Sequence, residues 1–189
     1  MGTTEEAGSA EDVVEFLLRQ HREAEQLFAR LEQADGEGRK EPFEQLVRLL
    51  AVHETAEEEV VYPAIRTAVE EGDRLADART AEEDEAKKAL SDLEQTGVDG
   101  AEFPERLQTV KGLVLTHARN EEQEIFPRLR QSQTPEQLET MAKAVRAAEA
   151  VAPTHPHPHG PESAVGNVVV GPFVGLVDRV RDAIRNVTR

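Results

Sequence analysis

The sequence contains no cysteine and no tryptophan, and aromatic residues make up only 4% of its 189 residues. Without cysteine the chain cannot form a disulfide, an iron–sulfur cluster, a cysteine-based zinc site or a thiolate nucleophile, so a metal ion would have to be held by His, Asp or Glu. Hydrophobic residues make up 38% of the chain and are mainly Leu, Val and Ala. A core built from such aliphatic side chains fits helices better than a sandwich of sheets.

Basic residues are also few, because 22 Lys and Arg stand against 38 Asp and Glu, which gives a formal net charge of −16. Nucleic-acid binding requires clustered Lys and Arg against the phosphates, so this charge argues against a nucleic-acid partner. An acidic surface instead attracts cations. The length suits one compact domain with a tail better than two full domains.

Long apolar runs are lacking. The longest, residues 164–177, includes Asn167 and Pro172 and is shorter than the roughly 20 apolar residues that span a bilayer. Residues 1–10 have neither the basic start nor the apolar stretch of a secretory signal. We therefore expect a cytoplasmic protein, and we do not expect a membrane partner.

Apolar residues at steps of three and four predict four helices, which is the pattern of an all-α, up-and-down four-helix bundle. Ser9 followed by Asp12 resembles a helix-start signal. Pro42 and Pro104 are favourable first positions, and Gly72 is expected to close the second helix. The expected helical segments are residues 14–31, 42–72, 73–95 and 104–127.

Extra helices are expected beyond the bundle. Thr134 followed by Pro135 resembles an N-cap with proline at the first helical position. A Pro- and His-rich stretch after that helix cannot be helical and is expected to be extended. The expected organisation is the bundle over 9–131, a short accessory helix over 134–152, a linker over 153–163 and an amphipathic helix over 164–189.

The linker contains three histidines that alternate with prolines. A His-rich tract can bind metal, but nothing nearby in the sequence supplies a buried shell for His155, His157 and His159, so we expect them to be exposed. The tail helix is expected to dock on the bundle, with dimerisation as the next alternative and a membrane surface as the least supported one. The chain is thus expected to be a monomer or a homodimer.

One sequence motif occurs in both the second and the fourth expected helix. His53-x3-Glu57 recurs 64 positions later as His117-x3-Glu121, and a proline follows each copy six residues after the Glu. A spacing of four places His and Glu side by side on one helical face. That face is the apolar one, so both pairs are expected to point into the bundle.

The first and third helices also repeat, at an offset of 62 residues, and in that register His21 corresponds to Glu83. Ionisable groups in a bundle interior cost several kcal/mol unless they are paired or bind metal. Two metal ions shared by six side chains would satisfy all of them, and imidazole with carboxylate suits Fe, Mn or Zn. The candidate ligands are His21, His53, Glu57, Glu83, His117 and Glu121.

The order of these residues discriminates between metal-binding families. The Glu-x-x-His motif of ferritin-like di-iron proteins is absent from the sequence. The segment from His53 to Glu57 also differs from the HExxH motif of zinc proteases, because Glu57 stands in place of the second His. With Tyr62-Pro63 and Phe126-Pro127 after the two motifs, the chain instead resembles the hemerythrin-like, or HHE cation-binding, family over roughly residues 10–130.

This resemblance implies a four-helix bundle around two irons joined by an oxo or hydroxo bridge, which reacts with dioxygen, peroxide or nitric oxide. By matching position, the three histidines would be terminal ligands, and Glu57 and Glu121 would bridge the irons. The third helix departs from the family pattern, because it lacks the usual His. Glu83 is the expected substitute, with Glu82 as the alternative. Tyr62 is expected to lie about half a turn away from the ligand face and to serve in packing.

Two functions are compatible with such a centre. The first is redox catalysis of the catalase, peroxidase or oxygenase type, with no catalytic residues beyond the metal ligands. The second is a non-catalytic module that binds or senses dioxygen or nitric oxide, or that binds iron itself. An additional anionic ligand at position 83 would favour the ferric state, which leads us to the hypothesis that the centre reacts with dioxygen or hydrogen peroxide rather than carrying oxygen reversibly.

Overall fold

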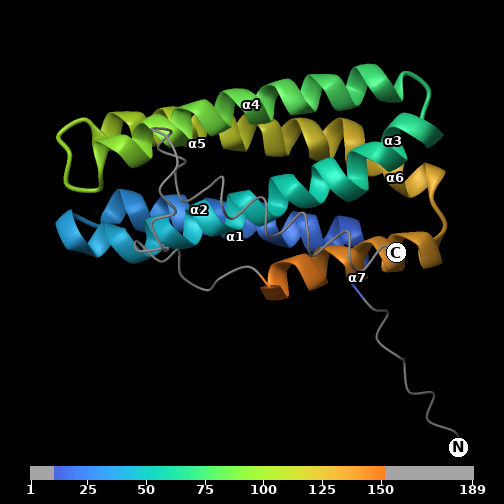
Figure 1. Ribbon diagram of the computed structural model, residues 1–189, viewed down its shortest axis with the longest axis horizontal. Helices are drawn as coiled ribbons and strands as arrows, with labels where there is room; N and C mark the ends of the chain where they lie inside the picture. The colour runs from blue at the N-terminus through green and yellow to red at the C-terminus, as the bar shows by residue number, and fades with distance from the viewer. Residues whose placement is uncertain (1–10, 152–189) are drawn as a thin grey trace, which may run out of the picture.

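The structure, a computed structural model, describes residues 11–151, and these are helical with short turns and without a β-strand (Figure 1). The α-helices are α1 (Val13–Gln33), α2 (Lys40–Ala56), α3 (Tyr62–Ala68), α4 (Gly72–Thr96), α5 (Phe103–Asn120), α6 (Phe126–Ser132) and α7 (Pro135–Val151). A 3-10 turn, η1 (Gly36–Arg39), precedes α2. Two π-helical turns, η2 (Glu57–Val61) and η3 (Glu121–Ile125), join α2 to α3 and α5 to α6.

Four helical arms make up the bundle. The segments α2, η2 and α3 follow one another without a break, and so do α5, η3 and α6. These two composite arms lie alongside α1 and α4 in an up-and-down arrangement, while α7 runs along the outside next to α1 (Figure 1). The predicted all-α four-helix bundle is confirmed.

The first helix begins at a capping box. The Asp12 side chain accepts a hydrogen bond from the Glu15 backbone N–H at 2.8 Å, and the Glu15 carboxylate accepts one from the Asp12 N–H at 3.4 Å. These bonds satisfy two of the amides that a helix start leaves unpaired. Asp12 is therefore the cap itself, and Ser9 lies outside the described residues.

The turn between α3 and α4 differs from the prediction. The second arm ends at Ala68, and Gly72 is the first residue of α4 instead of the last residue of the preceding helix. Glycine is needed at this position, because a Cβ atom there would collide with the backbone carbonyl of Ile65. The neighbouring Glu71 adopts a left-handed backbone conformation, with φ at 57°.

The two composite arms contain π-helical turns that the sequence pattern did not predict. Each turn starts at the Glu of a His-x3-Glu motif and ends two residues before a proline, Pro63 or Pro127. Proline lacks the amide that a regular α-helix requires, and its ring clashes with the carbonyl four residues back. A wider turn before the proline relieves that conflict, and such turns are frequent at functional sites.

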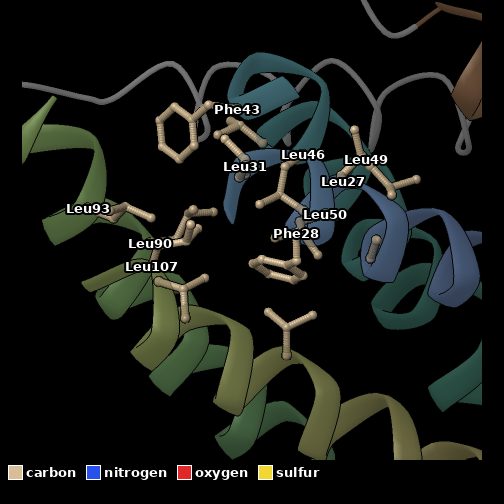
Figure 2. Close-up of a cluster of buried hydrophobic side chains, with 14 of the residues drawn as sticks. Leu27, Phe28, Leu31, Phe43, Leu46, Leu49, Leu50, Leu90, Leu93 and Leu107 are labelled. Carbon is tan, nitrogen blue, oxygen red and sulfur yellow. The ribbon is translucent and has the colours of Figure 1, made fainter. Parts of the chain in front are cut away.

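Two clusters of apolar side chains fill the bundle. The first joins side chains from all four arms toward one end, as Figure 2 shows for Leu27, Phe28, Leu46, Leu90 and Leu107. The second lies toward the other end and includes Phe16, Leu17, Ile65, Ala76, Phe126 and Leu129, together with Leu138 of α7. These aliphatic and phenylalanine side chains give the bundle its hydrophobic stabilisation.

A buried polar layer separates the two clusters. On α1, His21 falls between Leu17 of the second cluster and Ala24 of the first. On α4, Glu83 lies likewise between the residues that each cluster takes from that helix. Buried polar groups between two apolar regions are costly unless they are paired or bind an ion. The fold therefore surrounds one polar site with apolar core on both sides.

Outside the bundle, α7 has its own N-terminal cap and is hydrogen-bonded through Arg146 to Glu11, just before α1. Thr134 and Gln137 form a reciprocal cap at its first turn, with bonds of 2.8 and 3.3 Å. Arg146 donates to the backbone carbonyl of Glu11 at 2.6 Å and to its side chain at 3.1 Å. None of the helices in residues 11–151 is long and apolar enough to cross a membrane. The expected linker with His155, His157 and His159, and the expected helix over 164–189, lie outside the described residues.

Candidate metal centre

The six candidate ligands all lie buried in the polar layer, and each has an exposed fraction of 7% or less. They form two groups, and in each group one ligand atom per residue lies within 4.8 Å of the others. Glu57 belongs to both groups. The first group is His21, His53, Glu57 and Glu121, and the second is Glu57, Glu83 and His117.

In the first group, two imidazoles from different arms approach each other. The Nε2 atoms of His21 and His53 lie 3.1 Å apart. His21 Nε2 is 3.4 Å from Glu121 Oε2, and His53 Nε2 is 3.4 Å from Glu57 Oε1. The group thus presents two imidazole nitrogens and two carboxylates to one point.

In the second group, the carboxylates outnumber the imidazole. His117 Nε2 lies 3.8 Å from Glu57 Oε2 and 3.9 Å from Glu83 Oε1. It also lies 3.4 Å from Glu121 Oε2, the same oxygen that approaches His21. Glu57 and Glu121 therefore face the histidines of both groups, which is the placement that the family resemblance implies for shared carboxylates.

Several polar atoms of this layer have no hydrogen-bond partner. Four of them belong to candidate ligands: both carboxylate oxygens of Glu57, Oε2 of Glu121 and Nε2 of His117, all of which are buried. Unpaired buried donors and acceptors cost free energy, and unpaired charges cost more. Metal cations at this point would satisfy all four atoms, and nitrogen with oxygen donors suits iron, manganese or zinc. The residues present therefore fit a metal pair.

Burial and the neighbouring charges shift the pKa values of these groups in different directions. Burial, together with the nearby carboxylate of Glu121, raises the pKa of Glu57 well above its ordinary value. Burial acts the same way on Glu121, but the imidazoles of His117, His21 and His53 outweigh it and hold its pKa at about 2. Burial and the neighbouring His21 lower the pKa of His53 to about 3. His53 is therefore neutral at physiological pH, the form in which imidazole binds metal.

Each of the three histidines has a side-chain partner at Nδ1, its outer ring nitrogen, which lies away from the cluster of ligand atoms. Nδ1 of His53 lies 3.0 Å from Gln20 Oε1. Nδ1 of His21 lies 2.9 Å from Glu122 Oε1, and Nδ1 of His117 lies 3.1 Å from Glu82 Oε2. An acceptor at Nδ1 fixes the tautomer and leaves Nε2 free for a metal.

These contacts distinguish between Glu83 and Glu82, the two alternatives for the metal ligand on α4, the third helix expected from the sequence. Glu83 lies in the cluster of ligand atoms, whereas Glu82 lies outside it, on the outer nitrogen of His117. Glu82 also accepts hydrogen bonds from Asn120 and Arg79, both at 2.8 Å. The acidic run on this helix thus contributes one carboxylate to the cluster and another to the support around it.

Tyr62 lies in the site, and the expectation that it faces away from the ligands is wrong. Its hydroxyl donates to Glu83 Oε1 at 2.5 Å and to Glu121 Oε1 at 2.8 Å. The expectation assumed a regular α-helix from His53 onward, but the π-helical turn η2 intervenes and takes more residues per turn. That wider turn rotates Tyr62 toward the ligand face. At the matching position of the repeat, the ring of Phe126 stacks on His21 with centroids 5.5 Å apart.

A charged cluster, not predicted from the sequence, lies beside Glu83. Lys87 Nζ lies 2.6 Å from Glu58 Oε1, 3.4 Å from Glu83 Oε2 and 3.6 Å from Glu54 Oε2. Burial raises the pKa of Glu54 to about 8, and burial with the nearby Glu54 raises that of Glu83 to about 9. One signal was available in the sequence: the repeat pairs Lys87 with Glu25, so it breaks at positions 83 and 87 together.

A narrow cavity adjoins the site. It has about 20 Å³ of space for a water-sized molecule. His21, His53 and His117 line it on the polar side. Its other walls are mainly aliphatic, from Ala24, Leu49, Leu50, Ala86, Val114, Leu115 and Ala118.

The family model described as the hemerythrin HHE cation-binding domain matches residues 12–129, which include all six candidate ligands and the four arms except for the last three residues of α6. The chain belongs to this family. An uncharacterized hemerythrin-like protein of Schizosaccharomyces pombe is 30% identical over 139 residues, which cover 73% of this chain and 68% of that protein.

Two further similarities extend the comparison of this hemerythrin-like chain. A DNA nickase of Nostoc sp. is 31% identical over 141 residues, and these cover 73% of this chain but only 39% of the nickase. The crystal structure of a hemerythrin HHE cation-binding domain-containing protein from Mycobacterium kansasii matches with a TM-score of 0.65 at 24% identity, covering 75% of this chain and 89% of that one. The structural match supports the fold.

Proposed function

We propose that this chain binds two iron ions in its polar layer, held by the six candidate ligands, and that the iron-loaded chain acts on hydrogen peroxide or dioxygen. The observation that carries the proposal is the shared placement of Glu57 and Glu121, whose oxygens face the histidines of both ligand groups. Carboxylates shared between two groups inside a helical bundle are typical of dinuclear metal centres. When bound, the irons supply the electrons that peroxide or dioxygen takes up.

The residues around the site have separate roles in this proposal. His21 and His53 would hold one ion, and His117 with Glu83 would hold the other. Gln20 and its counterparts at the outer ring nitrogens keep the imidazoles turned inward. Such supporting contacts commonly change metal affinity or activity by about 10- to 100-fold.

The cavity suits a small reactant. About 20 Å³ is close to the space that one water molecule occupies, a size that fits dioxygen, nitric oxide or peroxide. Its aliphatic walls exclude bulk water and thereby strengthen the electrostatic interactions at the site. The small-molecule partner expected from the sequence is consistent with this cavity.

Glu83 favours redox chemistry over reversible oxygen carriage. It replaces a neutral imidazole with a carboxylate, and an anionic ligand stabilises the more positive ferric state. Tyr62 holds this carboxylate by a hydrogen bond of 2.5 Å, and Lys87 approaches its other oxygen at 3.4 Å. The proposed reaction is therefore of the catalase or peroxidase type, with oxidase-type chemistry as the related possibility.

We do not extend the name of the Nostoc relative to this chain. The similarity covers only 39% of that protein, so the activity in its name does not carry over to this chain. The net charge of −16 also opposes binding to a polyanion.

The decisive experiment measures oxygen evolution from hydrogen peroxide by the full chain loaded with two irons. We expect the disproportionation of two peroxide molecules to one dioxygen and two waters. Activity should be lost in His53→Ala and His117→Ala and retained in Lys88→Ala, whose side chain is exposed on α4. If protein that holds two irons evolves no oxygen and instead forms a stable adduct with dioxygen or nitric oxide, the chain is a binding module and the redox proposal is wrong.

A further inference from the structure

The two ligand groups of this site are chemically unequal. The repeat relates His53 and Glu57 to His117 and Glu121, so these four residues are supplied symmetrically. The remaining pair is not symmetric, because the residue that corresponds to His21 in the repeat is Glu83. One group therefore contains two imidazoles with the carboxylates of Glu57 and Glu121, and the other contains one imidazole with those of Glu57 and Glu83, so carboxylates outnumber imidazoles only in the second group.

The surroundings of the imidazoles also differ. The outer nitrogen of His53 meets a neutral amide, that of Gln20, at 3.0 Å, whereas the outer nitrogens of His21 and His117 meet the carboxylates of Glu122 and Glu82, at 2.9 and 3.1 Å. Gln20 and Glu82 are counterparts in the repeat, so the exchange of amide for carboxylate occurs at matched positions. A carboxylate acceptor makes an imidazole a stronger donor to a cation.

A further carboxylate lies on the same side. Glu54 is only 4% exposed, and its repeat counterpart is Ala118, so the other group has no equivalent acid at that position. Lys87 lies between Glu54 and Glu83 and approaches Oε2 of Glu83 at 3.4 Å. This contact leaves Oε1 of Glu83 as the oxygen that faces His117, at 3.9 Å.

We infer that the two positions prefer different metal ions. The nitrogen-rich position, at His21 and His53, selects Fe²⁺ or Zn²⁺. The oxygen-rich position, at His117 and Glu83, accepts Mn²⁺, so the chain can assemble a mixed-metal pair. The physical reason is that carboxylate oxygens suit the harder Mn²⁺, whereas imidazole suits iron and zinc. The inference rests on the proposed dinuclear site and adds which metal each position takes.

The test uses zinc and manganese without oxygen, so that no turnover is involved. Metal-free full chain receives one equivalent of Zn²⁺ and then one of Mn²⁺, and loosely held metal is removed by gel filtration. We expect about one zinc and one manganese per chain by elemental analysis, because the single zinc fills the nitrogen-rich position first. The electron paramagnetic resonance spectrum should show an isolated Mn²⁺ ion, since Zn²⁺ is diamagnetic.

Three variants make the assignment specific. Glu83→His restores the symmetry of the repeat and should lower manganese retention at least about three-fold, since imidazole favours zinc over manganese. Glu85→His makes the same exchange at an exposed position two residues further along α4 and should behave as the wild type. His21→Glu should gain a second retained manganese when Mn²⁺ alone is supplied, with a spectrum broadened by coupling between the two ions.

The outcomes separate this inference from the proposed function. Equal manganese retention in wild type and Glu83→His would overturn the metal preference while leaving a dinuclear site in place. Failure to retain any metal would instead overturn the proposed function itself.

Discussion

The hydroxyl group of Tyr62 donates a hydrogen bond to Glu83 at 2.5 Å. These two residues come from different arms, α3 and α4, and the same hydroxyl also contacts Glu121 at 2.8 Å. Burial and the neighbouring Glu121 raise the pKa of Tyr62, so the hydroxyl stays protonated and remains a donor. In the other half of the repeat, Phe126 stacks on His21. The carboxylate of Glu83 is thus contacted by a hydroxyl group, whereas the imidazole of His21 is contacted by an apolar ring.

Removing this hydroxyl should weaken the metal site. We expect Tyr62→Phe to lower the affinity for iron or zinc by about 10-fold, because outer contacts of this kind orient the ligating carboxylates. Titration of the metal-free chain with Zn²⁺ against a chelator measures the change. Phe126→Tyr serves as the matched control, since it adds a hydroxyl at the equivalent position without removing the bond to Glu83. Equal affinities in wild type and Tyr62→Phe would show that Tyr62 only fills space.

Loss of the Lys87 ammonium should destabilise the metal-free protein. Lys87→Met leaves Glu58, Glu83 and Glu54 without this cation, and losing a charged hydrogen bond costs about 1–3 kcal/mol. Urea unfolding at neutral pH measures the difference in the free energy of unfolding. The neighbouring Lys88 is exposed, so Lys88→Met should change stability by less than about 0.5 kcal/mol. Equal midpoints for the two variants would contradict a structural role of Lys87.

Metal binding should stabilise the fold. The buried oxygens of Glu57 have no hydrogen-bond partner, and a bound cation would relieve the cost of their burial. At a free metal concentration of about 100 times the dissociation constant, the gain is about 2.7 kcal/mol. That gain corresponds to a rise of the melting temperature of about 5–10 °C for a chain of this size. Calorimetry with Zn²⁺ and then with excess chelator tests the rise and its reversal, and His117→Ala should reduce it. A melting temperature that does not respond to metal would contradict the site.

Glu94 should make stability depend on pH in a definite direction. Burial raises the pKa of this carboxyl to about 7 in the folded state, from 4.5. Between these two values the folded state keeps a proton that the unfolded state has released. The contribution of Glu94 to stability is therefore highest below pH 4.5 and is lost as the pH rises through about 7.

The variant Glu94→Gln does not titrate and isolates this effect. Relative to the wild type it should gain stability as the pH rises from 4.5 to 7, and then level off. We expect a gain of about 1 kcal/mol, reduced from the full linkage value because the side chain is partly exposed. Denaturant unfolding over this pH range measures the difference, with Glu85→Gln as the exposed control on the same helix. A difference that is constant with pH would rule out the raised pKa.

The bundle and the convergence of the candidate ligands could be predicted from residue spacing. His53 and Glu57 lie four residues apart on an apolar stripe, and a four-residue spacing on a helix is a local property that needs no tertiary information. The doubled motif then placed two such pairs in one interior. The offset of 62 residues pointed to Glu83 as the counterpart of His21, and the structure places both in the cluster.

Contacts between arms could not be predicted in this way. Lys87 lies among carboxylates from both α4 and the second arm, and no spacing along one helix reveals which side chains face it across the bundle. In the sequence, Glu82 was one acid in a run of four and the alternative to Glu83 as a metal ligand. Only the position of His117 on a different helix shows that Glu82 holds the outer nitrogen of that ring.

The sequence by itself determined the helical class and the set of ligand-type residues, because both follow from the period of the α-helix and from the absence of cysteine. The tertiary structure alone decided where Tyr62 lies. A regular helix would carry it away from the ligands, but the π-helical turn η2 before Pro63 changes the register and brings its hydroxyl onto Glu83. The reason is that a proline restricts the turn before it, whereas the partner reached by the rotated side chain depends on how the neighbouring arm packs.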